Sequence, residues 1–429
     1  MSANAASAVA TSTTSERLTL RSTQDTWAGW INVVVGAVIM LATLPGRTQG
    51  LGLITEPMLR DLQLDRVTYA NINLWATLLG AAICLPIGRA FDRVGLRGST
   101  FALTAMLAVV VYSMSRLAGG TMLLFLLVLA TRALGQSALS VSSITAVAKS
   151  FDRQVGVAMG VYSVLITIFF AAAFTAVGAA IRISGWRTAW AGVAVGLMLF
   201  AAPIVLLLRE GPVQAGAGAD SGAAGNAASG EPGRGLSLVA ALRTPAFWVF
   251  GGAMSSFGLA SSGLGLFNEA VLAERGFDQR TYVTFLASTA VIGLFGQLAC
   301  GWLTLRWSMT RLLSLAMCIY AAALVAMPLI HSISQLWIVA VLIGISGGMI
   351  TVIFFAVWRQ AFGPAHLGRI QGAAQMLTVL ASAIGPLVFA QCAAVTGSYM
   401  PALWILAPSV LLLGLAALRV RMPTATESA

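Results

Sequence analysis

Long apolar segments recur along the whole chain and are separated by short polar stretches. A helix of about 20 residues crosses the ~30 Å hydrocarbon core of a bilayer, and each segment is long enough to do so. The pattern therefore predicts twelve transmembrane helices, at residues 27–55, 69–88, 98–117, 121–148, 154–181, 188–208, 245–272, 281–304, 311–330, 335–358, 369–396 and 400–418.

One long polar interruption, residues 211–235, divides these segments into two groups of six. It consists largely of Gly and Ala, which is the composition of a flexible linker. The expected organisation is a disordered cytoplasmic tail at 1–26, a six-helix bundle at 27–210, a flexible cytoplasmic linker at 211–243, a second six-helix bundle at 244–421 and a cytoplasmic tail at 422–429.

The two groups of segments resemble each other in sequence. GLGLITEPML at 50–59 matches GLGLFNEAVL at 263–272, and the same offset of 213 residues aligns Asp65 with Asp278. Repeats that meet at a pseudo-two-fold axis, with a substrate site between them, are the architecture of secondary transporters. We therefore expect an all-α membrane protein made of two pseudo-symmetric six-helix bundles.

The composition agrees with a membrane protein, because 58% of the residues are hydrophobic and only 9% are charged, whereas a soluble domain carries about 25% charged residues. The net charge of +11 does not indicate a nucleic-acid partner, since the cations lie in short loops between apolar segments. They are concentrated on the side that holds both termini, which the positive-inside rule assigns to the cytoplasm. We expect a multi-pass protein of the bacterial inner (plasma) membrane.

The sequence lacks the motifs of enzymes and ATP-driven pumps. It has no GxxxxGK[ST] phosphate loop and no HExxH zinc motif, and no GxSxG stands at a strand-to-helix turn. The four cysteines stand singly within apolar segments, which favours packing over a metal site or a disulfide. We expect no enzymatic activity, no cofactor and no metal.

Two motifs resemble the major facilitator superfamily. GRAFDRVGLR at 88–97 resembles its signature loop, Gly-x-x-x-Asp-Arg-x-Gly-x-Arg, and TRALGQ at 131–136 resembles its fourth-span arginine motif, carried by Arg132 and Gly135. In that superfamily the signature loop is a conformational latch at the cytoplasmic side. The resemblance implies this role for Gly88, Asp92, Arg93, Gly95 and Arg97. It covers nearly the whole chain and implies a transporter with the major facilitator fold.

A narrower resemblance concerns the monocarboxylate and oxalate/formate porter branch. PGRTQGLG at 45–52 and KSFDRQVGVAMG at 149–160 are similar to segments of that branch. Its members commonly carry a basic residue just after a proline in the first span, as Arg47 follows Pro45 here. They typically carry a cation in the eighth span as well, whereas residues 281–304 contain no charge. The resemblance is compatible with carboxylate transport without requiring it.

Arg47 stands inside the first apolar segment, and the offset of 213 places Ala260 at the equivalent position. An unpaired charge at mid-membrane costs about 2.5–3.5 kcal/mol on insertion scales. Either an anionic substrate or coupling group stabilises this cation, or it is held by an acidic partner such as Glu269, or it snorkels to the interface. Thr43 shares the face of Arg47 and Gln49 points to nearly the opposite side; both are further candidates for binding substrate.

Three charged residues are candidates for coupling transport to protons. Glu56 and Glu269 occupy equivalent positions in the two repeats, and this symmetry favours a shared structural role over proton transfer. Arg132 aligns with Ile345, so it is present in one half only. The resemblance implies that Arg132 acts either in coupling or in contact between helices.

Four uncharged residues lie on spans that line the central cavity in the superfamily fold: Tyr162, Gln297, Trp358 and Gln375. A polar or aromatic side chain within a span is more often a packing residue than a ligand. Both roles stay open for each of them.

The sequence thus predicts a secondary active transporter that moves a small organic anion, with monocarboxylates among the candidates, by alternating access and with a proton as coupling ion. The expected partners are a small-molecule substrate, the proton and the lipid bilayer, and the expected state is a monomer. Two alternatives stay open. One is an exporter of neutral solutes or drugs with the same fold, and the other is a transporter-like sensor that does not transport.

Overall fold

Every element in the described part of the chain is a helix. The computed structural model describes residues 27, 29–148, 150, 155–209, 236–363 and 367–422, and it describes the backbone alone for residues 83–94, 148, 155–157, 359 and 367–369. A helix satisfies its backbone N–H and C=O groups internally, which is what a segment surrounded by lipid requires.

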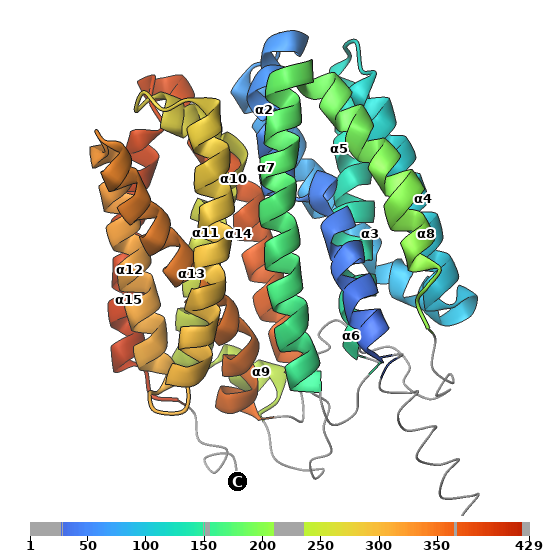
Figure 1. The fold of residues 1–429 in the computed structure, drawn as a ribbon. Helices are drawn as coiled ribbons and strands as arrows, with labels where there is room; N and C mark the ends of the chain where they lie inside the picture. Colours follow the sequence, from blue (N-terminus) through green and yellow to red (C-terminus); the bar gives the residue numbers. More distant parts are fainter. Residues whose placement is uncertain are drawn as a thin grey trace, which may run out of the picture.

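The two halves of the chain form two helical bundles that stand side by side (Figure 1). The first bundle holds a helix over residues 29–42, then η1 (Leu44–Gly46), α2 (Thr48–Leu62), α3 (Arg66–Val94), α4 (Leu96–Ser115), α5 (Thr121–Thr131), η2 (Arg132–Leu139), α6 (Ser140–Ala148), α7 (Val155–Gly196), η3 (Leu197–Ala201) and α8 (Ala202–Val205). The second bundle holds α9 (Leu238–Leu242), α10 (Pro245–Ala273), α11 (Gln279–Leu303), α12 (Met309–Ala326), η4 (Met327–Leu329), α13 (Ile333–Phe362), α14 (Leu367–Thr396) and α15 (Met400–Arg419).

The helices account for the twelve predicted spans. In the described part of the chain, nine helical segments are long and apolar enough to cross a membrane. One of them, Ala158–Val205, turns at Gly185 (φ 79°, ψ 161°) and therefore comprises two spans. The helices α3 and α10, of 29 residues each, are not among these nine segments, but they cover the predicted spans at 69–88 and 245–272. The structure thus has the all-α architecture that the hydrophobic pattern predicts.

The sequence repeat is also a structural repeat. Asp65 and Asp278 each accept a hydrogen bond at Oδ1 from the backbone N–H three residues later, that of Thr68 at 2.8 Å and that of Thr281 at 2.9 Å. Each aspartate is therefore the N-cap of a helix. These hydrogen bonds from Thr68 and Thr281 also hold the pKa of both carboxyl groups below its ordinary value.

The two bundles contact each other at the end of the molecule where α2 ends. Gly52 on α2 and Gly265 on α10, which are equivalent in the repeat, lie so close that a Cβ added to Gly52 would collide with the carbonyl oxygen of Gly265. Gly178 on α7 meets the side chain of Val283 on α11 in the same way. We call this contact between the bundles, around Gly52, Gly265, Gly178 and Val283, the seam. It lies at the end of the bundle opposite α9, as the top and bottom of Figure 1 show.

Candidate functional site

The first span is not one continuous helix, as the apolar pattern over 27–55 predicted. The helix over 29–42 gives way to a 3₁₀ turn at Leu44–Gly46, and Arg47 follows with an extended backbone (φ −87°, ψ 150°) before α2 begins. Pro45 explains the break, because proline has no N–H for the helical ladder and its ring clashes with the carbonyl of the preceding turn. The prediction of an unbroken span was therefore wrong at this point.

The break places the N-terminus of α2 inside the first span. No side chain caps this end, and its first turn contains no acidic residue. The N–H groups of a first helical turn lack intrahelical partners and carry a partial charge equivalent to about +0.5. Such an end favours an anion.

Glycine residues allow the backbone of this break to pack closely against the backbone of the fourth span. A Cβ added to Gly46 would lie 2.8 Å from the backbone nitrogen of Gln136 and 3.0 Å from the Cα of Gly135. Both residues belong to η2, which is a π-helical stretch. Stretches of this kind occur frequently at functional sites, where they shift the side chains that follow. Here the stretch begins at Arg132 and brings it to the break.

The side chain of Arg47 folds back along the first span and is partly buried. Its Nε donates to Oγ1 of Thr43 at 2.7 Å, which places the two residues on one face as their spacing indicates. Its Nη2 donates to Sδ of Met40 at 2.7 Å and to Oγ of Ser140 at 3.3 Å. The ring of Phe170 lies 5.3 Å from its Cζ, within the range of a cation–π interaction. All four neighbours are uncharged.

Arg132 reaches the break from the fourth span and is 2% exposed. Its Nη1 donates to the carbonyl of Gly46 and to Oγ1 of Thr48, both at 3.0 Å. The same group donates to Oε1 of Gln136 at 2.6 Å, and Nη2 donates to Oδ1 of Asn73 at 2.9 Å. These acceptors are uncharged too, and the buried Nε has no partner among the described residues.

Two other arginines in the described part of the chain are neutralised by acids. Arg66 pairs with Glu56 at 2.7 Å and Arg187 pairs with Asp61 at 2.8 Å. Arg47 and Arg132 instead have only neutral acceptors among the described residues. We call Thr43, Arg47, Arg132 and the N-terminus of α2 the arginine site. Its two cations and its helix end leave an excess of positive charge that an anion would balance.

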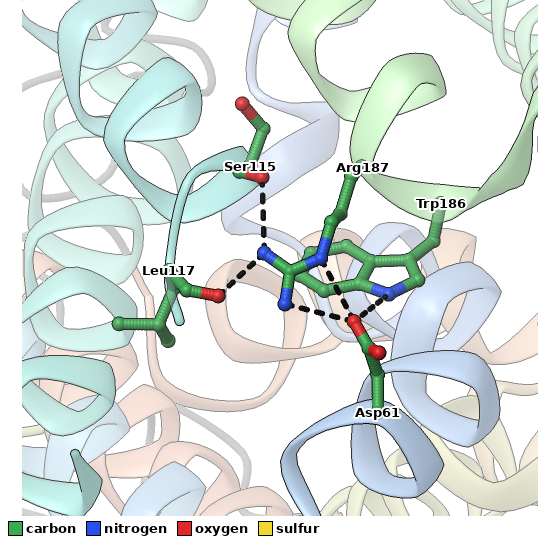
Figure 2. Close-up of polar contacts among 5 residues, drawn as sticks. All are labelled: Asp61, Ser115, Leu117, Trp186 and Arg187. Atoms are coloured by element: carbon green, nitrogen blue, oxygen red, sulfur yellow. Dashed lines mark hydrogen bonds and ion pairs between the residues drawn. The ribbon is translucent and has the colours of Figure 1, made fainter. Parts of the chain in front are cut away.

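The pair between Asp61 and Arg187 belongs to a structural clamp, which Figure 2 shows. Asp61 Oδ2 accepts from Nε1 of Trp186 at 3.2 Å and from Nε of Arg187 at 2.8 Å. Arg187 also donates to the backbone carbonyls of Ser115 and Leu117 at the end of the third span. The clamp ties the end of α2 to two other turns of the first bundle.

The second bundle contains a counterpart of this clamp. Glu274 aligns with Asp61 at the offset of 213. It accepts hydrogen bonds from Oγ of Ser398 at 2.8 Å and from the backbone N–H of Tyr399 at 3.0 Å. Because both halves use the acid in the same way, we assign it to the scaffold and not to a binding site.

Glu56 and Glu269, which are equivalent in the sequence repeat, have different surroundings. Glu56 is 4% exposed and accepts from Nε of Arg66 at 3.2 Å and from its Nη2 at 2.7 Å. Glu269 interacts with the side chain of Gln279 and with the charges of Glu56 and Arg60. Its Oε2 is buried and has no hydrogen-bond partner among the described residues. The repeat therefore holds one acid that is paired and one that is not.

The structure also places the other predicted partners of Arg47. Tyr162 lies beside the arginine site: its hydroxyl is 2.7 Å from Oγ of Ser143 and interacts electrostatically with Arg47. Glu269 does not appear among the contacts that the structure gives to Arg47, so a pair between these two residues does not explain the cation within the described residues.

The remaining uncharged candidates have different surroundings. Gln49 meets Gly265 at the seam. Trp358 is fully buried and packs against aromatic rings, with Phe362 stacked on it at 6.1 Å. Gln297 on α11 is partly exposed and Gln375 on α14 is exposed. The structure thus gives Thr43 a hydrogen bond to Arg47 and Tyr162 an electrostatic contact with it, and substrate binding by the other four residues stays a prediction.

The predicted latch spans the end of α3 and the start of α4. Gly88, Asp92 and Arg93 belong to the part of α3 for which the structure describes the backbone alone. Gly95 has a left-handed backbone (φ 87°, ψ 152°) and begins α4, and Arg97 is exposed in the first turn of that helix. The latch role of this segment stays a prediction.

Some neighbours of the two arginines were not predicted from the sequence. Met40 precedes Arg47 by seven residues and Gln136 follows Arg132 by four, so helical spacing could have indicated both. Ser140, Phe170 and Asn73 come from other spans. No pattern within one segment could have found these three.

Metal binding has no support in the described residues. They contain no group of three or more His, Cys, Asp or Glu side chains that could hold a metal ion. The cysteines Cys300, Cys318 and Cys392 are free, and Cys84 lies outside the residues whose side chains are described.

The family model described as Major Facilitator Superfamily matches residues 35–386 and 273–429. Among solved structures, the chain is similar to a bacterial homolog of the human lysosomal transporter Spinster in an inward-facing, unoccupied conformation. The identity is 16%, the match covers 92% of this chain and 94% of that one, and the TM-score is 0.66. It is also similar to the nucleoside transporter NupG, with 12% identity, coverage of 91% and 98%, and a TM-score of 0.72. No curated protein matches the chain in sequence.

Proposed function

Because the chain belongs to the Major Facilitator Superfamily and is a multi-pass membrane transporter, we propose that it moves a small organic anion across the membrane by alternating access. A monocarboxylate is the simplest anion of this class. The observation that carries the proposal is the arginine site, where Arg47 and Arg132 flank the N-terminus of α2 with only neutral acceptors among the described residues.

A cation in a span is costly unless something neutralises it. Hydrogen bonds from Arg47 to Thr43 and Ser140 orient its guanidinium but supply no countercharge. A carboxylate would supply that charge and would also accept bonds from the first-turn N–H groups of α2. Broken helices that point a half-helix N-terminus at an anionic group are a recurrent device of secondary transporters. A planar, two-oxygen anion fits the fork of an arginine particularly well.

Phe170 and Met40 extend the proposed site beyond the charged group. Both contact the guanidinium of Arg47, and both offer apolar surface that could cover the hydrocarbon part of an organic acid. Tyr162 lies on the same side, within electrostatic reach of Arg47. These neighbours favour an organic anion over a small inorganic one.

The cycle that we propose uses the two bundles as rigid bodies. The seam holds them together at the end opposite the linker. With the linker and both termini in the cytoplasm, as the positive-inside rule indicates, the seam faces the outside and the structure corresponds to an inward-facing state. We place the transporter in a bacterial inner membrane as a monomer, and we assign the proton as its coupling ion, with Arg132, Glu56 and Glu269 as the candidate coupling residues.

A thermal-unfolding screen tests the anion site. Purified protein is heated with lactate, oxalate or benzoate, and with glucose and uridine as neutral solutes. A ligand at 100 times its Kd adds about 2.7 kcal/mol to the apparent stability, so at least one acid should raise the Tm of the wild type. Arg47→Gln should lose that increase, because losing one partner of a buried charge pair costs roughly 2–5 kcal/mol of affinity.

The matched control is Arg182→Gln, which removes the same charge from an exposed position on α7. It should keep the increase in Tm. A Tm that rises only with glucose or uridine, or a rise with an acid that survives Arg47→Gln in full, would rule out the proposed site.

A further inference from the structure

The repeat reveals a difference between the halves beside the seam. Glu56 and Glu269 are aligned by the offset of 213, and the same offset aligns Arg66 with Gln279. In the first half the acid pairs with the arginine, at 2.7 Å. In the second half the aligned neighbour of the acid is an amide, which carries no charge. One member of an otherwise shared ion pair has been replaced.

The replacement leaves Glu269 without a dedicated countercharge. Its Oε2 is buried and has no hydrogen-bond partner among the described residues. Across the seam it faces the like charge of Glu56 on α2. Arg60, also on α2, is an opposite charge within electrostatic reach of Glu269, but Arg60 is exposed, and solvent weakens such pairs.

The other titratable groups around Glu269 are already engaged or neutral. Arg66 on α3 is bonded to Glu56, and Glu274 on α10 is bonded to Ser398 and to the backbone of Tyr399. Tyr282 on α11 lies within electrostatic reach of Glu269, and its hydroxyl has no hydrogen-bond partner among the described residues. The hydroxyl of Tyr399 interacts with Arg66. Neither tyrosine is charged near neutral pH.

A cavity of about 390 Å³ gives access to this position. Glu56, Arg60 and Arg66 of the first bundle line it together with Glu269, Ala273 and Glu274 of the second. The cavity thus lies between the bundles, at the end of the molecule where the seam is closed.

We propose that Glu269 is a proton-binding site that controls closure of the seam. When the bundles approach, the carboxylate of Glu269 is brought against Glu56 with one oxygen unsatisfied, which is costly for a charged group. A proton on Glu269 removes the charge and the repulsion. Protonation therefore favours the closed seam, and deprotonation favours its opening. The sodium ion is the other small cation that two carboxylates could bind, and the experiment separates the two.

The proton site rests on the proposed function only in requiring that the bundles move. The two aligned acids take different roles that the proposed function does not assign: Glu56 is structural and Glu269 is titratable. The test needs no substrate, so it can fail while the anion site stands, or succeed while the anion site fails.

The experiment measures the distance across the seam as a function of pH. Spin labels are attached at Ile183→Cys on α7 and Thr284→Cys on α11, two exposed positions on either side of the seam, in a background without the four native cysteines. Distances are recorded by pulsed electron paramagnetic resonance in lipid nanodiscs between pH 5 and pH 9, with choline as the only other cation.

In the parent protein, the short-distance population should dominate at low pH and decline at high pH. Its ratio to the long-distance population should change by up to about tenfold per pH unit, the limit for one proton. Glu269→Gln should show the short distance at every pH. Gln279→Arg, which copies the pair of the first half, should do the same, because it supplies the missing countercharge.

In a matched variant, Arg66→Gln, the first half carries a glutamine at the position where the second half has Gln279. It should steepen the pH dependence, since Glu56 then also lacks a partner. The proposal is overturned if the parent shows equal populations at pH 5 and pH 9, if its pH dependence survives in Glu269→Gln and Gln279→Arg, or if the populations at fixed pH follow the sodium concentration. Size-exclusion profiles confirm that each variant is folded before its distances are compared.

Discussion

At the scale of single residues, the arginines of this chain are distinguished by what neutralises them. Arg66 and Arg187 pair with acids and belong to the scaffold. Arg47 and Arg132 have only neutral acceptors among the described residues, so no acid neutralises their charge there. An ionisable group within a span is by default a functional candidate, and its local partners determine which candidates deserve mutation first.

The sequence identified Arg47 correctly as asymmetric but left its surroundings open. Thr43 was within reach of prediction because it lies one helical turn away. Ser140 and Phe170 were not, since they come from spans whose rotation and depth depend on packing. The difference between Glu56 and Glu269 was readable from the aligned Arg66 and Gln279, but only with the knowledge that these residues are neighbours in space.

The N-cap aspartates give a prediction about pH. The pKa of Asp65 and of Asp278 is lowered by the bonds from Thr68 and Thr281. A lowered pKa in the folded state contributes stability above the unfolded-state value of about 3.9, and that contribution is lost as the pH falls through the folded-state pKa. The Tm of the wild type should therefore fall between about pH 5 and pH 3.

The double variant Asp65→Asn with Asp278→Asn checks this directly. Asparagine keeps an uncharged cap acceptor, so the Tm at pH 7 should change little while the fall toward pH 3 becomes smaller. An unchanged fall would show that these two carboxyl groups do not contribute to it.

At the scale of elements, the decisive feature is the break in the first span. Pro45 and Gly46 are local signals for it, and a stricter reading of them would have interrupted the predicted helix. The π-helical stretch over Arg132–Leu139 has no comparable local signal. It lies where Gly135 approaches Gly46, a contact between two spans far apart in the sequence.

Gly46→Ala tests whether this contact holds the break in place. The added Cβ would meet the backbone of the fourth span and not a flexible side chain, so overpacking should cost about 1–3 kcal/mol. We expect a lower Tm and a weaker response to the acid that stabilises the wild type.

Gly192→Ala is the control for that substitution. Its added Cβ would meet nothing within 4 Å, and alanine is a better helix former than glycine by about 0.5–1 kcal/mol. Its Tm should stay the same or rise. Equal losses in the two variants would mean that the close approach of Gly46 is unimportant.

At the scale of the whole molecule, the repeat predicted two equivalent bundles, and the structure shows how they meet. The glycines of the repeated GLGL segments, Gly52 and Gly265, face each other at the seam. The repeat thus preserves small residues where two copies of the same helix must approach closely. Which end of the molecule is closed could not be predicted, because both bundles are compatible with either arrangement and small differences in contact energy decide between them.

The transport claim is tested most directly by counterflow in proteoliposomes. Vesicles that contain the purified protein are loaded with the unlabelled acid that raises the Tm, and uptake of the same acid in radiolabelled form is followed. The wild type and Arg182→Gln should accumulate label transiently, whereas Arg47→Gln should remain at the level of empty vesicles while inserting normally. Full counterflow by Arg47→Gln would contradict the assignment of Arg47 as the anion-binding residue.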